Sequence, residues 1–302
     1  MKKVLIISAI ALVIAALGLI TRGHTAPSSA VQETISGDWT AKVKQTDKGP
    51  VLWMSLNRDS GSRKDRFQMS RDFPLHTFTS FNPNSGSNVR FTLGHEAGTV
   101  IFEGLFKDDK GVGDFRFTPN SGFIATMRSL GYDGLTTENL FTMAVLDVGS
   151  NFINEMKSLG FDKPDLDQLI GLRALGVTVE FAREAQDWGF GKLSANDLME
   201  IKAMGINPDY IRSMKSLGFD DLSLRKVIEL KAMGINEDYV KEMRSVGFEN
   251  IPVEKLIEMK AMGITADYVR KMRELGLKNV SINELIQIKA TGADKILVRE
   301  KR

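Results

Sequence analysis

Three histidines are the residues of this chain best suited to metal or acid–base chemistry, and they are His24, His76 and His95. His95 precedes Glu96, which is how a helical zinc-peptidase motif begins, but that motif needs a second histidine one helical turn later. Thr99 stands at that position. The chain contains no cysteine, so disulfides, zinc–thiolate sites and cysteine nucleophiles are excluded. We therefore predict no metal site, no cofactor and no catalytic residues.

Two other kinds of catalytic signature lack their required context. No serine lies in a G-x-S-x-G elbow, the strained turn that exposes a serine nucleophile. The run Gly111-Val112-Gly113 is too short for a phosphate-binding loop and does not join a strand to a helix. The sequence therefore favours a protein that is not an enzyme.

A column of cations recurs at a fixed spacing in the second half of the chain. Its members are Arg173, Lys202, Lys231, Lys260 and Lys289. Such a column could grip an anionic ligand, but a cation in the last turn of a helix also offsets the negative end of the helix dipole. Glutamates two positions earlier, such as Glu229, show that the surface is not of one sign. We favour the structural interpretation and keep the four lysines as candidate partner-binding residues.

Two apolar features offer further candidates for binding. Trp188 stands where the other repeats carry leucine or valine, and an exposed tryptophan is a good anchor for a partner. We nevertheless favour a buried Trp188 and keep it as a candidate. Met204, Met233 and Met262 could form an adaptable binding stripe, although core packing is the favoured interpretation.

These candidates all belong to a repeat with a period of 29 residues. The units begin at Met127, Met156, Ala185, Met214, Met243 and Met272. A fixed period of this length without insertions is typical of a solenoid. We therefore predict that residues 120–302 form an α-helical hairpin-repeat solenoid of six units.

Each unit reads as two short helices. The first is expected to begin at a capping serine such as Ser194 and to end at a glycine such as Gly205, and the second to end at a glycine such as Gly218. Helices of about ten residues do not persist alone in water, so the units must bury their apolar sides against their neighbours. Two columns are expected in that core: Leu140, Leu169, Leu198, Val227, Leu256 and Leu285, and Phe152, Phe181, Tyr210, Tyr239, Tyr268 and Leu297.

Residues 36–119 have a different pattern, in which apolar and polar residues alternate. Trp39, Ala41 and Val43 show the period of a half-buried strand, and Asp108–Gly111 reads as a tight hairpin turn. We predict a small antiparallel β-sandwich or barrel here, which makes the whole chain an α+β multidomain protein. A domain of this size is expected to need the repeats to cover one of its faces.

The first 30 residues look like an export signal. Lys2 and Lys3 precede an apolar run at residues 4–20, and small residues follow as far as Ala30. Two alternatives stay open: a signal peptide cleaved before Val31, or a retained single membrane anchor. Both place the remainder of the chain outside the cytoplasm, in the periplasm or secreted.

The charge balance argues against nucleic acid as a partner. Lys and Arg number 40 and Asp and Glu 38, so the net charge is only +2. A nearly neutral chain has no bulk electrostatic attraction to a polyanion. The hydrophobic fraction of 42% is that of an ordinary folded protein.

One stretch of the sequence resembles a known group of proteins. The run from Gly98 to Asn120, followed by Met127-Arg-Ser-Leu-Gly-Tyr132 and the repeats, is similar to C-terminal extracytoplasmic segments attached to some bacterial membrane metallopeptidases of the β-lactam-sensor type. The resemblance covers about residues 36–302. This chain has one apolar segment and no H-E-x-x-H, so the peptidase activity does not carry over. The resemblance implies an envelope location and a sensing or interaction role.

We therefore predict an exported, non-enzymatic binding or scaffold protein. Its helical repeat surface would contact an envelope or secreted protein partner. The alternative is an envelope sensory or structural protein that binds a cell-wall or other anionic polymer through the cation column. A third hypothesis, a hydrolase with an unrecognised site in the β domain, would need a deep pocket with converging carboxylates.

Overall fold

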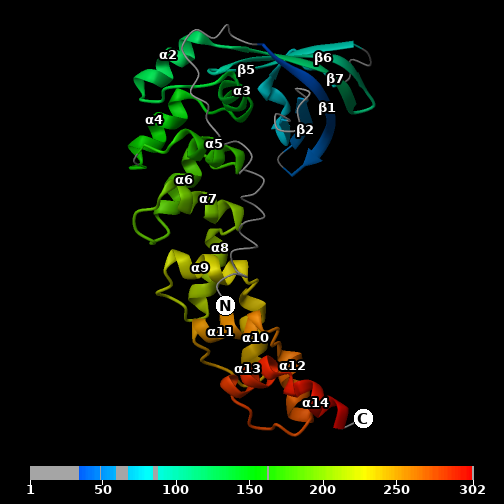
Figure 1. Ribbon diagram of the computed structural model, residues 1–302, viewed down its shortest axis with the longest axis vertical. Coiled ribbons are helices and arrows are strands. Elements are labelled where there is room, and N and C mark those ends of the chain that lie inside the picture. The colour runs from blue at the N-terminus through cyan, green and yellow to red at the C-terminus, as the bar shows by residue number, and fades with distance from the viewer. Residues whose placement is uncertain (1–33, 48, 59–66, 84–87, 162, 301–302) are drawn as a thin grey trace. The chain divides into compact units, whose positions relative to one another are not determined.

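The computed structural model describes residues 34–47, 49–58, 67–83, 88–161 and 163–300 (Figure 1). The chain divides into two compact units, one ending at Ala182 and the other running from Arg183 to the C-terminus. We call the first the sheet unit and the second the repeat unit, whereas 'units' used alone continues to mean the 29-residue repeats. The strands end at Pro119 and helices follow from Ser121, while the predicted domain limits of 36–119 and 120–302 stay predictions.

The sheet unit is built on one antiparallel sheet of seven strands. They are β1 (Ile35–Thr46), β2 (Gly49–Arg58), β3 (Phe67–Pro74), β4 (Phe78–Thr79), β5 (Asn88–His95), β6 (Gly98–Lys107) and β7 (Lys110–Pro119), with the 3₁₀ turn η1 (Leu75–Thr77) before β4. The strand order is β3-β2-β1-β7-β6-β5-β4, and the sheet curls into a half-barrel (Figure 1). This confirms the predicted antiparallel β domain, and of the two architectures considered the sheet approaches the barrel.

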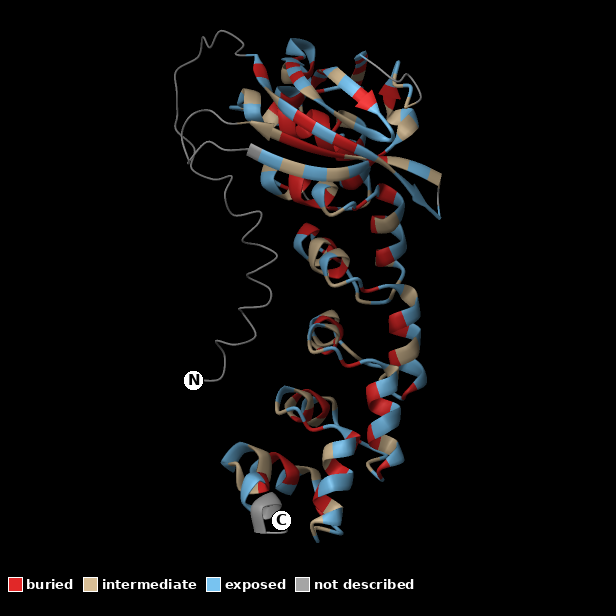
Figure 2. Ribbon diagram, turned by 90° about the vertical axis from the view of Figure 1, so that its right-hand side faces the viewer, coloured by how far each residue is buried: buried red, intermediate tan, exposed pale blue. Residues whose placement is uncertain are grey.

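The alternation in the sequence sets the two faces of this sheet (Figure 2). Successive side chains of a strand point to opposite faces, so the apolar positions share the inner face of the curl. The buried inner residues include Trp39, Ala41, Leu52, Met54, Leu56, Phe91, Leu93, Val100, Phe102, Phe106, Phe115 and Phe117. Val43, near the end of β1, is only half-buried.

The turn between β6 and β7 is the tight hairpin that the sequence predicts. Asp108 and Asp109 have φ of 51° and 62°. Two left-handed residues in a two-residue loop twist in the sense that matches the flanking strands, and aspartate tolerates this conformation. The turn therefore fixes the register in which Lys107 pairs with Lys110.

Trp39 fills the inside of the curl where two glycines face each other. Gly104 of β6 pairs with Gly113 of β7, which in turn pairs with Trp39 of β1. The Trp39 indole Nε1 donates to the carbonyl oxygens of Glu103, at 3.2 Å, and Asp114, at 3.1 Å. The missing side chains bring the strands close together, and the buried indole is left with a satisfied N–H.

Helix α3 (Thr137–Leu146) covers the inner face of the sheet. It packs against strands β1, β5, β6 and β7, and its residues 140–146 are all buried. Phe141 stacks on Phe115 with a centroid distance of 5.3 Å and an interplanar angle of 4°, and its ring lies 5.3 Å from that of Phe117. The expectation that repeat helices cover one face of the β domain is therefore confirmed.

The rest of the described chain consists of short helices. They are α2 (Ser121–Ser129), α4 (Ser150–Ser158), α5 (Leu166–Ala174), α6 (Val179–Gln186), α7 (Ala195–Ala203), α8 (Pro208–Ser216), α9 (Leu224–Ala232), α10 (Glu237–Ser245), α11 (Val253–Ala261), α12 (Ala266–Glu274), α13 (Ile282–Thr291) and α14 (Ala293–Glu300). Odd-numbered helices from α3 to α13 are the first helices of the units, even-numbered ones from α4 to α14 are the second, and α2 precedes the first unit. This confirms the predicted run of short helices after the β domain.

The helices begin and end at the predicted residues. The hydroxyl of Ser194 accepts from the backbone N–H of Asp197, and the side chain of Asn207 caps α8 in the same way. The glycines at the helix ends have positive φ, such as 61° at Gly205, and the next residue donates back to the last helical turn, as Ile206 N–H does to the carbonyl oxygen of Ile201. Asp147 takes the glycine position in the first unit and adopts the same left-handed conformation, with φ of 58°.

The first predicted core column is buried throughout. Its members are Leu140, Leu169, Leu198, Val227, Leu256 and Leu285, each no more than 2% exposed. In the repeat unit, first helices pack on first helices, as α11 does on α13, and second on second, as α10 does on α12. The units of this part of the chain therefore stack, as short helices in water require.

The predicted export segment at residues 1–30 lies outside the described residues. The helices that are described are all too short or too polar to cross a bilayer. The signal peptide and the membrane anchor therefore stay predictions.

Candidate interaction surface of the repeat unit

The lysines of the cation column lie over the rings of tyrosines from the preceding unit. Lys231 Nζ is 4.4 Å from the centroid of the Tyr210 ring, and Lys260 Nζ is 4.2 Å from that of Tyr239. Lys289 Nζ takes the same place over Tyr268, at 4.3 Å. A cation at this distance is attracted by the electron-rich face of the ring. The two columns found in the sequence thus form one set of contacts between successive units.

The tyrosine hydroxyls connect the same units. Tyr210 Oη donates to the carbonyl oxygen of Ile235 at 2.7 Å, and Tyr239 Oη donates to that of Ile264 at 2.9 Å. Each acceptor follows the glycine that ends the first helix of the next unit. A buried hydroxyl with a partner stabilises the stack, whereas a buried hydroxyl without one would destabilise it. These hydrogen bonds join residues 25 positions apart, and their pairing could not be read from the sequence.

An equivalent cation–ring contact in the sheet unit shows which groups of the preceding helix the cation binds. Arg173 lies over the Phe152 ring at 5.1 Å, and its Nε donates to the carbonyl oxygen of Leu146 at 3.1 Å. Its Nη2 pairs with the Asp147 carboxylate at 2.7 Å. The cation therefore acts on the end of the preceding first helix. The cation also lies in the last turn of its own helix, as the sequence predicts, so the contact to the preceding helix is an additional role.

Burial of the tyrosines raises their pKa, which gives a testable prediction. The pKa rises from the usual 10.0 to about 12 for Tyr239 and for Tyr268, where the nearby Asp294 adds to the effect. Burial likewise raises the pKa of Tyr210 and, together with Asp165, that of Tyr132. Because the folded pKa lies above the unfolded one, the resulting stability is complete below pH 10 and is lost as the pH rises from 10 towards 12.

Spectrophotometric titration of tyrosinate absorbance checks this expectation. The chain has four tyrosines, and all four have raised pKa values. We expect no tyrosinate to form at the usual pKa in the folded protein, and all four to titrate there in concentrated urea. A folded sample in which any tyrosine titrates at its usual pKa would contradict the packing of that ring.

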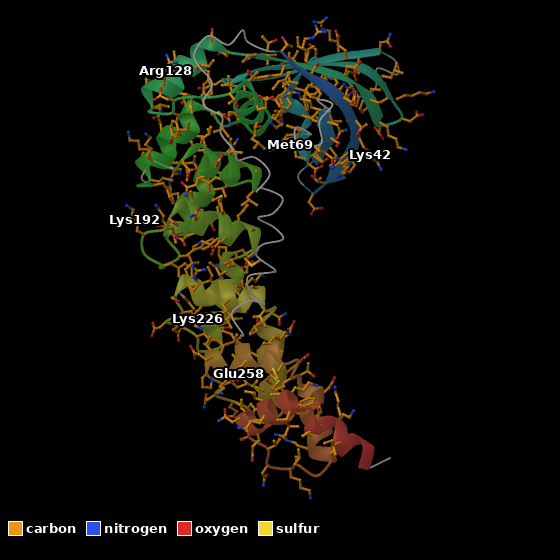
Figure 3. All side chains as sticks on the ribbon, viewed as in Figure 1. Lys42, Met69, Arg128, Lys192, Lys226 and Glu258 are labelled. Atoms are coloured by element: carbon orange, nitrogen blue, oxygen red, sulfur yellow. The ribbon has the colours of Figure 1, made fainter. Side chains whose placement is uncertain are left out.

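The exposed side of the first helices is occupied by ion pairs. Lys226 of α9 contacts Glu229 at 2.9 Å and Glu254 at 3.7 Å, and Lys255 contacts Glu258 of α11 at 2.9 Å. Figure 3 labels Lys226 and Glu258 on their two helices. The hydrogen bond to Glu229 is the main reason that the pKa of Lys226 is raised. Glutamates near the lysine column are therefore already paired with other cations, within and between units.

Met204, Met233 and Met262 are half-buried, which corrects the core assignment that the sequence favoured. They are the last residues before the glycines that end α7, α9 and α11. The chain turns away after that position, so neighbouring helices cover these side chains only in part. The methionines that begin the units, such as Met243, are fully buried instead. A row of partly exposed methionines thus lies at the ends of the first helices, as the lysines do.

Two further features lie on the second helices or directly after them. Trp188, the other candidate anchor, is half-buried, so the expected burial is partial. Arg244 Nη2 donates to the carbonyl oxygen of Leu217 in the preceding unit at 2.5 Å, and Arg273 lies over the Phe248 ring at 5.8 Å. Arg244 and Arg273 thus also connect neighbouring units.

The His95–Glu96 pair connects the sheet to two helices. His95 Nδ1 lies 2.5 Å from the carbonyl oxygen of Ala144 at the end of α3, which places the ring proton on Nδ1. Glu96 Oε2 accepts from the backbone N–H of Ser150, at 3.1 Å, and from its hydroxyl, at 2.6 Å, at the start of α4. Within the described ranges, no group of three or more His, Cys, Asp or Glu side chains is arranged to hold a metal ion.

Two arginines donate hydrogen bonds to the last carbonyl groups of α3. Arg71 Nη1 donates to the carbonyl oxygen of Val145 at 3.3 Å, beside the Arg173 contact to Leu146. Burial is the main cause that lowers the pKa of Arg71, with Arg173 adding to it and Asp147 opposing it. Helix α3 therefore has its last carbonyl groups satisfied from three separate elements, which a sequence pattern does not reveal.

The outer face of the sheet holds a polar hollow of about 480 Å³. Three carboxylates line it in one row across the strands, Asp38, Asp114 and Glu103, and Glu103 pairs with Arg90 at 3.1 Å. All of these side chains are exposed. A face open to solvent does not supply the low-dielectric surroundings in which carboxylates act as a tuned acid and base.

Comparison of the chain with protein-family models, with curated proteins and with solved structures finds no match. The resemblance to segments of sensor-type metallopeptidases therefore stays a prediction, and the proposals below are based on the residues of this chain.

Proposed function

We propose that this chain is an extracytoplasmic binding or scaffold protein, not an enzyme, that holds a protein partner on the surface of its helical repeats. The observation that carries the proposal is the row of Met204, Met233 and Met262. All three are half-buried at the same position of successive units. A flexible, polarizable side chain that is partly exposed can adapt to an apolar partner surface.

The periodic surface is the second support. Stacked units repeat each surface position at a near-constant spacing, so weak contacts that one unit makes are made again by the next. The Lys231 and Lys260 contacts and the Tyr210 and Tyr239 hydrogen bonds hold that spacing fixed. A surface whose units are already ordered loses little conformational entropy on binding.

Location outside the cytoplasm is part of the proposal. It is supported by Lys2 and Lys3, by the apolar run at 4–20 and by the small residues up to Ala30. The partner is accordingly an envelope or secreted protein, and the segment at 4–20 is either a removed signal or a single anchor.

An anionic polymer of the cell wall is the second candidate ligand. Lys231 and Lys260 favour it, because neither Nζ has a carboxylate within ion-pair distance in the described part of the chain. The mixed charges on the neighbouring surface, such as Glu229 and Glu258, favour a protein instead. The negative charges of this mixed surface repel a uniform polyanion and offset the attraction of the lysines.

The function is tested with a photo-crosslinking residue in place of Met233 in the exported full chain. We expect a protein to be captured there, and the purified partner to bind the wild-type chain directly. Replacing Met204, Met233 and Met262 with serine should weaken that binding by about tenfold or more, because a contact residue in the centre of an interface contributes 1 kcal/mol or more.

A matched control replaces cations on the exposed side of the second helices. Arg212, Lys241 and Arg270 each pair with an acidic residue of their own helix, so changing all three to alanine leaves the methionine row intact. We expect this control to bind the partner as wild type does. Equal binding by the methionine variant, or binding that only the sheet unit supports, would refute the proposed surface.

A further inference from the structure

Lys231 and Lys260 are positive charges that each lie over a tyrosine ring of the preceding unit. Both are half-buried, and their Nζ atoms lie 4.4 Å and 4.2 Å from the tyrosine ring centroids. The Lys260 side chain also lies beside Gly234 of the preceding unit, with its Cε 4.0 Å from where a Cβ would be. A lysine held in this way loses less side-chain entropy on meeting an anion than a free surface lysine does.

The charge of these two lysines is not neutralised by the described protein. Lys289, at the same position in the last unit, pairs with Asp294 at 3.3 Å, whereas Lys231 and Lys260 have only their ring contacts among the described residues. The nearest glutamates in sequence, Glu229 and Glu258, pair with Lys226 and Lys255. The surface thus presents two equivalent cations that no carboxylate of the described residues neutralises.

We propose that these lysines bind two carboxylates of one acidic helix in the partner protein, separated by about seven residues. This deepens the proposed function and rests on it. Lys231 lies on α9 and Lys260 on α11, and these helices are neighbours, since Lys226 of α9 contacts Glu254 of α11 at 3.7 Å. Neighbouring packed helices lie about 8–10 Å apart. Two turns of a partner helix, about seven residues, advance about 10.5 Å. Carboxylates at that spacing therefore match the two lysines.

Four other exposed cations among the described residues of the repeat unit do not offer this arrangement. Lys241 pairs with Glu237 of its own helix at 2.5 Å, and Arg212 pairs with Asp209. Lys215 and Lys271 are exposed and lie over no aromatic ring of the described residues. Charge reversal at Lys215 and Lys271 therefore gives a control with the same change in net charge.

The test measures binding of the full chain to two labelled synthetic helical peptides by fluorescence anisotropy. One peptide of about 21 residues carries glutamate at every seventh position, and the other has the same composition with the glutamates at irregular spacing. We expect the regular peptide to bind about tenfold more tightly. K231E/K260E should abolish that preference, and K231R/K260R should retain it, because arginine keeps both the charge and the ring contact.

Controls separate this result from loss of fold and from general attraction. Circular dichroism of every variant is compared with wild type, and K231M/K260M removes the charge while keeping an apolar stem. We expect K215E/K271E to keep the preference for the regular peptide. Equal binding of the two peptides, or an equal loss in K215E/K271E, would overturn the inference.

A third ligand, inorganic polyphosphate, distinguishes an acidic helix from an anionic polymer. Tighter binding of polyphosphate than of the regular peptide, lost in K231E/K260E, would assign the lysines to a polymer and overturn the proposed helix. The proposed function stands separately, because its captured partner is tested with the methionine variant. If the two peptides bind equally but the methionine variant loses binding to the captured partner, only the inference about the lysines is refuted.

Discussion

Replacing Phe141 with alanine is expected to lower the free energy of unfolding by about 3–5 kcal/mol, because it removes a buried ring and leaves a cavity. The side chain is 1% exposed and stacks on Phe115 and against Phe117. It is the ring of α3 that enters the curl of the sheet. Urea unfolding of the full chain, followed by the fluorescence of Trp39 and Trp53 in the sheet, measures the change.

The control for this prediction is Leu105→Ala on the outer face of the same sheet. Leu105 is 57% exposed, and its truncation should change stability by no more than about 0.5 kcal/mol. Phe141→Leu should fall between the two, since it keeps most of the apolar volume. A Phe141→Ala variant as stable as Leu105→Ala would show that α3 does not cover the sheet.

The helical part of the fold could be predicted because its determinants are local. A serine such as Ser194 and a glycine such as Gly205 act within one turn of a short helix, and the period of 29 residues repeats them at the same positions. The alternation of apolar and polar residues around Trp39 and Ala41 similarly predicted the strands and the residues of their inner face. Each inference needed only residues near one another in the sequence.

The contacts between units could not be predicted because their partners are distant in sequence. The sequence showed the lysine column and the tyrosine column separately. Only the stacking of the units places Lys260 over Tyr239 and gives Tyr239 the carbonyl oxygen of Ile264 as its acceptor. The same holds for His95, whose acceptor Ala144 lies 49 positions away.

The prediction that the methionine row lies in the core was wrong for a different reason. Composition alone favours burial for methionine, and the residues before the terminal glycines follow an apolar pattern. The exposure of Met233 depends on where neighbouring helices end, which is a tertiary property. For Trp188 the structure likewise gives an intermediate exposure that the sequence could not assign.

Replacing Gly113 with alanine is expected to destabilise the sheet by more than about 4 kcal/mol, because the substitution forces the backbone of two paired strands to move. A Cβ at Gly113 would overlap the carbonyl oxygen of Glu103 and would lie 2.6 Å from the Cα of Gly104. Backbone atoms of a paired strand cannot rotate aside as a side chain can, so β6 and β7 would have to separate.

Separation of these strands would also disturb Trp39. Its Nε1 donates to the carbonyl oxygens of Glu103 and Asp114, one on each strand. A shift of either strand lengthens at least one of these bonds and leaves a buried polar group unsatisfied. We therefore expect a change in Trp39 fluorescence in folded Gly113→Ala, together with the loss of stability in urea.

Gly94→Ala is the matched control, because Gly94 also lies in a strand of this sheet. A Cβ there would meet only the Thr99 hydroxyl, at 4.0 Å, on the exposed side of β5. Its cost should stay within about 0.5 kcal/mol, since surface substitutions without strain are nearly neutral. If Gly113→Ala were as well tolerated as Gly94→Ala, the close approach of β6 and β7 would be wrong, and with it the explanation of how the sheet curls around Trp39.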